Sequence, residues 1–152
     1  MNMRIIRRYK WLLIVVLAVP TGVFFFFYRM YHNDIKALRG FIASYERFDK
    51  AISDLSMSGA DDIESKVGNA VIDLSAKASL RLSSLIKNDA ELMDQAIEVA
   101  DLVRRELEDL RVYRSEIRNK NADLDGLAEE SRILTGKRKA AYARFQELSG
   151  TR

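Results

Sequence analysis

The chain has 152 residues, of which 31% are charged, and its formal net charge is +3. Four of the basic residues, Arg4, Arg7, Arg8 and Lys10, lie within the first ten positions. Without these four, 21 Lys and Arg stand against 22 Asp and Glu, a net charge of −1, which argues against a nucleic-acid-binding surface. Because the chain has no cysteine, a disulfide framework and thiol chemistry are excluded.

Residues 11–28, WLLIVVLAVPTGVFFFFY, form an apolar run of eighteen residues without a charge. A helix of that length spans about 27 Å, close to the thickness of a bilayer's hydrocarbon core. The bulky residues from Phe24 to Tyr28 offer no small-residue cleavage site, so we expect an uncleaved transmembrane anchor in lipid rather than a signal peptide. Trp11 and Tyr28 mark the two interfaces, and Pro20 is expected to kink the helix in mid-span.

The orientation of this anchor follows from the basic residues on either side of it. Residues 1–10 hold four Lys and Arg, whereas the ten positions after the span hold only Arg29 and Lys36. Positive charge favours the cytoplasmic side, so residues 1–10 are expected to be a cytoplasmic flank. The body of the protein would then lie outside the inner (cytoplasmic) membrane, in the periplasm if the cell is Gram-negative.

Residues 29–57 are expected to continue the anchor outward as a helix. Their apolar residues follow the 3–4 spacing of a heptad seam: Leu38, Phe41, Tyr45, Phe48, Ile52 and Leu55. Small residues and a glycine at 56–60 then end this helix. Asp61 with Glu64 has the spacing of a capping box, so a second helix is expected over residues 61–87, antiparallel to the first.

A longer heptad pattern begins with a capping signal at Asn88 and Asp89 and covers residues 89–149. Two structures fit this pattern. A break near residues 119–126, where Asn119, Asn121 and Gly126 disfavour helix, would leave four helices in an up-down bundle. Because the heptad phase crosses this point without a shift, we expect one continuous helix instead. The apolar seam gives the candidate interaction residues: Leu92, Val99, Val103, Leu110, Tyr113, Ile117, Leu124, Leu127, Leu134, Phe145 and Leu148.

The expected fold is therefore all-α, with a single N-terminal transmembrane helix that continues into a helical hairpin or a long coiled-coil-like helix. Four seam positions are polar: Glu106, Lys120, Ser131 and Arg138. Either the seam drifts around the helix and leaves them exposed, or they are buried and fix the register of the packing. We expect them to be exposed.

No arrangement of residues points to catalysis or to a bound cofactor. The only histidine, His32, lies next to the expected membrane interface, and no zinc, calcium or phosphate-binding motif occurs. Glu129 and Glu130 are adjacent in a helical pattern and therefore point in different directions. We expect no enzyme activity, no cofactor and no catalytic, cofactor-binding or metal-binding residue.

The layout, one span followed by a helical body, resembles the inner-membrane spanin subunits of phages and the short division proteins with an outer coiled coil. It also loosely resembles the b subunit of rotary ATP synthases, although the basic N-terminus turns the body the other way. These resemblances concern topology only. The long heptad seam, which has to pack against a partner helix or a second copy, predicts a membrane-anchored scaffold or adaptor in a cell-envelope assembly. A sensor-like ligand module, with a pocket lined by Tyr45, Tyr113 or Tyr142, and a spanin-like lysis protein are the alternatives.

Overall fold

The computed structural model describes the backbone of residues 3–58, 61–83, 85–86, 88–117 and 123–150, and side chains of residues 14, 16–54, 65–83, 85–86, 88–117 and 123–150. This part of the chain forms four helices and no strand, which confirms the all-α prediction. The helices are α1 (Met3–Ser58), α2 (Asp61–Ala78), α3 (Asp89–Glu116) and α4 (Leu124–Ser149).

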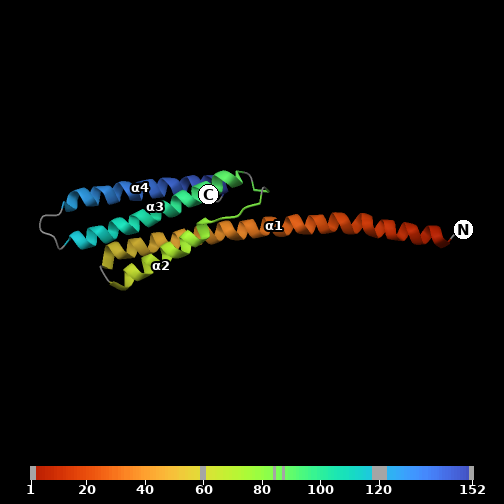
Figure 1. The fold of residues 1–152 in the computed structure, drawn as a ribbon, viewed down its shortest axis with the longest axis horizontal. Coiled ribbons are helices and arrows are strands. Elements are labelled where there is room, and N and C mark those ends of the chain that lie inside the picture. The colour runs from red at the N-terminus through yellow and green to blue at the C-terminus, as the bar shows by residue number, and fades with distance from the viewer. Residues whose placement is uncertain (1–2, 59–60, 84, 87, 118–122, 151–152) are drawn as a thin grey trace.

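Helix α1 is an unbroken rod that carries the apolar run and the first helix of the bundle together. Its N-terminal half projects well beyond the other three helices (Figure 1). Pro20 lies inside α1 and has no N–H to give to a preceding carbonyl. The Thr21 hydroxyl donates to the carbonyl of Leu17 at 2.7 Å, one residue beyond the Val16 carbonyl to which a residue other than proline at position 20 would donate. The apolar run and the first helix of the bundle thus belong to one continuous helix.

Among the residues whose side chains are described, no helix is sufficiently long and apolar to cross a membrane. The expected span, residues 11–28, lies partly outside this set, because side chains 11–13 and 15, including that of Trp11, are not described.

The four helices pack around a single apolar core. Neighbours along the chain, α1 with α2, α2 with α3 and α3 with α4, are also neighbours in space. Aromatic contacts between α1 and α4 close the ring, since Phe41 and Phe145 lie 4.7 Å apart between ring centroids. The described core residues come from every helix and from the connection after α2: Leu38, Phe41, Tyr45, Phe48, Val67, Val71, Leu74, Ala78, Leu80, Leu92, Ala96, Val99, Ala100, Val103, Leu107, Ala141, Tyr142 and Phe145.

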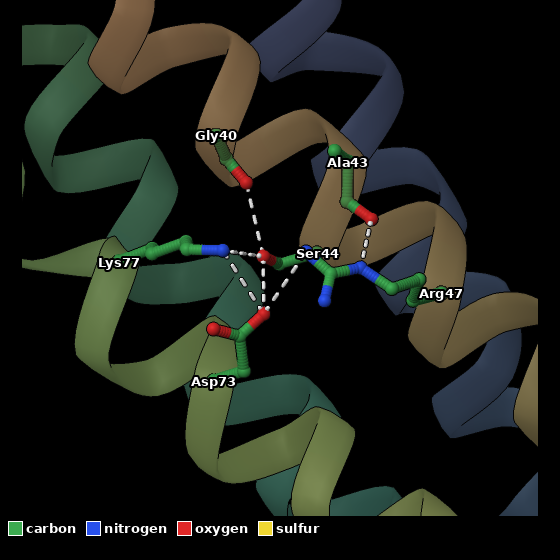
Figure 2. A network of polar contacts seen from close by, with 6 residues as sticks. All are labelled: Gly40, Ala43, Ser44, Arg47, Asp73 and Lys77. Atoms are coloured by element: carbon green, nitrogen blue, oxygen red, sulfur yellow. Dashed lines mark hydrogen bonds and ion pairs between the residues drawn. The ribbon is translucent and has the colours of Figure 1, made fainter.

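A polar cluster holds α1 against α2 where the two helices cross at mid-bundle (Figure 2). The buried Ser44 hydroxyl lies 2.7 Å from an Asp73 oxygen and 2.9 Å from the Gly40 carbonyl, and its one proton serves one acceptor at a time. Lys77 donates to Ser44 at 2.8 Å and to Asp73 at 3.0 Å, and Arg47 lies 3.4 Å from the same carboxylate oxygen. Bonds from Ser44 and Lys77 hold the pKa of Asp73 below its ordinary value. The cluster therefore fixes how far α2 slides along α1.

The second helix is shorter than predicted, because α2 ends at Ala78 and not near Lys87. The described residues after Ala78, namely 79–83, 85–86 and 88, instead form a non-helical connection that is bonded to α1. The buried Asp34 carboxylate accepts hydrogen bonds from both the backbone N–H and the hydroxyl of Ser83. Serine side chains and an acceptor on another helix compete with helical hydrogen bonding, and a pattern of apolar spacing does not report this competition.

The prediction of one continuous helix over residues 89–149 is wrong. Helix α3 ends at Glu116, α4 begins at Leu124, and the two run antiparallel side by side (Figure 1). Asp123 caps α4 by accepting a hydrogen bond from the Gly126 N–H at 2.9 Å. The constant heptad phase did not distinguish the two structures, because the step from Ile117 to Leu124 is one heptad and each helix of a hairpin needs its own seam.

Candidate functional site

The N-terminal arm of α1, residues 14–31, has its described side chains almost entirely in contact with solvent. Phe24 is 71% exposed, and its three phenylalanine neighbours and Tyr28 are also exposed. Pro20 lies on the same exposed arm. A soluble helix normally hides one apolar face, whereas this arm is apolar around its whole circumference and no other helix of the chain covers it. The predicted anchor residues Pro20, Phe24 and Tyr28 therefore share one unpartnered surface.

A buried ion cluster lies at the opposite end of the core, between α1, α3 and α4. Arg138 of α4 is fully buried, and its Nε lies 2.5 Å from Oε2 of Glu106 of α3, which is 3% exposed. Its Nη1 donates to the Tyr45 hydroxyl at 2.6 Å and lies 2.8 Å from a carboxylate oxygen of Asp49, both on α1. Thr135 donates to the second oxygen of Glu106 at 2.5 Å. One guanidinium thus joins three helices.

The expectation that Glu106 and Arg138 are exposed is wrong. They are buried together, and the alternative, that polar seam residues fix the packing, describes them better. Ser131 is half-buried, and Lys120 lies outside the described residues. The sequence signal was present, since two seam positions on either side of the segment of low helix propensity carry opposite charges.

The electrostatics of the cluster keep Arg138 charged and its tyrosine neighbour neutral. Burial alone would lower the pKa of Arg138, but Glu106, Tyr45 and Asp49 outweigh it, and the pKa is raised. Burial also raises the pKa of Tyr45, and Arg138 only partly opposes this. The arrangement therefore holds a permanent cation inside the bundle.

Aromatic rings complete this layer on the side of the core. Tyr45 of α1 stacks on Tyr142 of α4 with ring centroids 3.5 Å apart and planes within 11°. The Arg138 guanidinium lies 5.3 Å from the centre of the Tyr45 ring and 5.2 Å from that of Phe48. The stacked tyrosines fill space in the core, and neither they nor Tyr113 line the three hollows described for this part of the chain.

Beyond the ion cluster the bundle no longer has a closed core. Within residues 108–117 and 123–137, none is buried. A hollow of about 290 Å³ opens here, with Asp49, Glu106 and Arg138 on one side and Ile52 and Leu110 on the other. The polar layer therefore separates a dry core from an open end of the bundle, which we call the distal end.

The candidate seam residues differ in burial between the closed part of the bundle and its distal end. Those in the closed part of the bundle are buried: Leu92, Val99, Val103 and Phe145. Those half-buried lie mostly at the distal end, with Leu148 at the other: Leu110, Tyr113, Leu124, Leu127, Leu134 and Leu148. Ile117 is 54% exposed. The seam is thus one continuous stripe that the chain covers at one end and leaves partly open at the other.

Sequence reasoning missed the polar residues of α1 and α2 that pair with groups on other helices. Asp49 pairs with Arg138, and Ser44 pairs with Asp73, but none of them occupies a pattern that distinguishes it from an ordinary surface residue. Among the described residues, no group of His, Asp and Glu lies close enough to hold a metal ion. In the comparisons with known proteins, no family model, no curated protein and no solved structure matches this chain.

Proposed function

We propose that this protein is a membrane-anchored helical adaptor, in which α1 crosses the membrane through residues 11–28 and the bundle binds a partner helix at its distal end. The observation that carries the proposal is the position of the two uncovered apolar surfaces at opposite ends of one rod. The apolar arm of α1 lies at one end, and the open seam of α3 and α4 lies at the other.

The anchor is supported by the chain's apolar run and by the exposure of its described residues. Eighteen uncharged residues suit a hydrocarbon core, and exposed phenylalanine rings in water would cost free energy that lipid would recover. The excess of basic residues before the run favours an orientation in which the bundle lies outside the cytoplasm. An alkaline phosphatase fused after Arg152 should be active, and a cytoplasmic reporter at the same point should be silent. The reverse pair of results would contradict this topology.

The distal docking surface is supported by the half-covered seam. A partner helix with apolar residues at 3–4 spacing would complete the packing that α1 and α2 leave open at Leu110, Leu127 and Ile117. Such a contact gains free energy through burial of apolar area, and it needs no catalytic group.

The test uses a matched pair of substitutions on α3. Ile117 is 54% exposed on the seam, whereas Val112 is 48% exposed and lies off it. The full chain would be purified from its cells in mild detergent as wild type, Ile117→Asp and Val112→Asp, and the co-purifying proteins would be compared. A partner lost with Ile117→Asp and kept with Val112→Asp supports the seam. Equal recovery with all three chains would refute it.

A further inference from the structure

The connection between α2 and α3 reaches down the side of α1 to the level of the tyrosines that end the apolar run. It runs past the ends of α2 and α3 toward the N-terminal arm (Figure 1). Bonds from Ser83 to the buried Asp34 hold the connection to α1. Further along, Leu85 and Ile86 share the lining of one hollow with Tyr31 and Ile35 of α1. Ser83, Leu85 and Ile86 of the connection thus all lie against α1.

Apolar side chains gather where this connection ends. The hollow they share has a volume of about 560 Å³ and is closed on its third side by Leu148 and neighbouring residues at the end of α4. Leu85 is 41% exposed, and Tyr31 is 50% exposed. Arg144, also in the lining, is already bonded to Glu91 at 2.7 Å. The base of the bundle therefore presents an apolar surface of its own, next to the apolar arm of α1.

The distance from this surface to the expected bilayer is short. From Phe27, near the end of the run, to Tyr31 is four residues, or about 6 Å along a helix. The interfacial layer on each side of the hydrocarbon core is about 5–8 Å thick. Leu85 and Ile86, which lie beside Tyr31, would thus be at the depth of the lipid headgroups when α1 spans the membrane.

We propose that the described part of the connection forms a second membrane contact, in which Leu85 and Ile86 insert into the headgroup region of the bilayer. The inference rests on the proposed transmembrane anchor and extends it. The occupant of the hollow is phospholipid, because the apolar part of its lining, Tyr31, Ile35, Leu85 and Ile86, adjoins the exposed arm of α1. Exposed basic residues on α1 and on the connection would suit lipid phosphates: Arg29, Lys36, Arg39 and Arg81.

A second contact has a mechanical consequence. A single helix would let the bundle tilt freely about the point where α1 leaves the membrane. A contact to one side of α1, tied to it through Asp34, restricts that tilt and sets the distance of the distal end from the membrane.

The absence of cysteine allows a direct test with the full chain. Leu85→Cys and Ile72→Cys would be labelled with an environment-sensitive fluorophore and reconstituted into vesicles of phosphatidylcholine and phosphatidylglycerol. Ile72 is the control, because it is 69% exposed and lies on α2 within the bundle. The label at 85 should show blue-shifted emission and lose intensity when a lipid with a nitroxide at its headgroup is added. The label at 72 should show neither change.

The two proposals fail in different ways. If the labelled chain floats with the vesicles and the label at 85 emits as the label at 72 does, the second contact is refuted and the anchor stands. If the chain does not float with the vesicles, the anchor is refuted, and the second contact is refuted with it. A nitroxide near the end of the acyl chains should quench the label at 85 less than one at the headgroup. The opposite order would contradict the interfacial depth.

Discussion

Replacing Arg138 by methionine should destabilise the bundle severely. Methionine fills much of the arginine's volume, but it leaves Glu106 at 3% exposure without its cation. Breaking a buried ion pair by removing one partner costs about 3–5 kcal/mol, because the remaining charge is uncompensated. For a chain of this size that cost corresponds to a fall in melting temperature of roughly 6–20 °C.

The informative comparison is with the double variant Arg138→Met with Glu106→Leu. It removes both buried charges, and replacing a buried pair by apolar residues is often neutral or stabilising by about 1–4 kcal/mol. Asp49 does not repeat the problem, since its side chain is 45% exposed and water hydrates it. The double variant should therefore recover most of the stability that the single variant loses.

Thermal unfolding of the full chain in mild detergent, followed by circular dichroism, would measure all three proteins. Retention of helix at low temperature would show that each variant folds before it melts. The reasoning is refuted if Arg138→Met melts within a degree or two of the wild type. It is also refuted if the double variant is no more stable than the single one.

Three further predictions use the same melting assay or a titration of tyrosine absorbance. Val103→Asp, in the closed core, should cost more than Leu110→Asp, which lies at the half-covered distal end; equal losses of melting temperature would contradict the open end. Because folding lowers the pKa of Asp73, its contribution to the free energy of unfolding is complete above its ordinary pKa of 3.8 and is lost as the pH falls through the lowered pKa of the folded state. The melting temperature of Asp73→Asn should therefore depend less on pH in that acidic range than the melting temperature of the wild type. Burial raises the pKa of Tyr142 to about 12, so Tyr142→Phe should leave the tyrosine absorbance titration near pH 10 unchanged.

Much of the fold follows from features that are local in sequence. The absence of proline after Pro20 and the heptad spacing predict helices throughout, and the small residues at 56–60 correctly separate α1 from α2. The helix start after Asn88 is also correct. These features depend on backbone propensity and on one helix face at a time, which a sequence displays directly.

The parts that could not be predicted depend on contacts between distant residues. The early end of α2 requires Asp34 to meet Ser83, 49 positions away. The half-covered seam at the distal end requires knowing how much of it other helices cover: Leu110 is half-buried and Ile117 is 54% exposed. Apolar spacing identifies which face of a helix packs, but it does not show how much of that face the rest of the chain covers.

For the hairpin of α3 and α4, by contrast, the sequence did contain information about contacts between distant residues. In an antiparallel pair, residues that meet are equidistant from the turn. The midpoint between Glu106 and Arg138 is residue 122, and the midpoint between Glu91 and Arg144 lies between residues 117 and 118. Both fall in the connection between α3 and α4. On one continuous helix, 32 residues would separate Glu106 from Arg138 by about 48 Å, and each would be left in an apolar seam without a partner. Opposite charges placed symmetrically about a segment of low helix propensity favour folding back, and this symmetry outweighs an unbroken heptad phase.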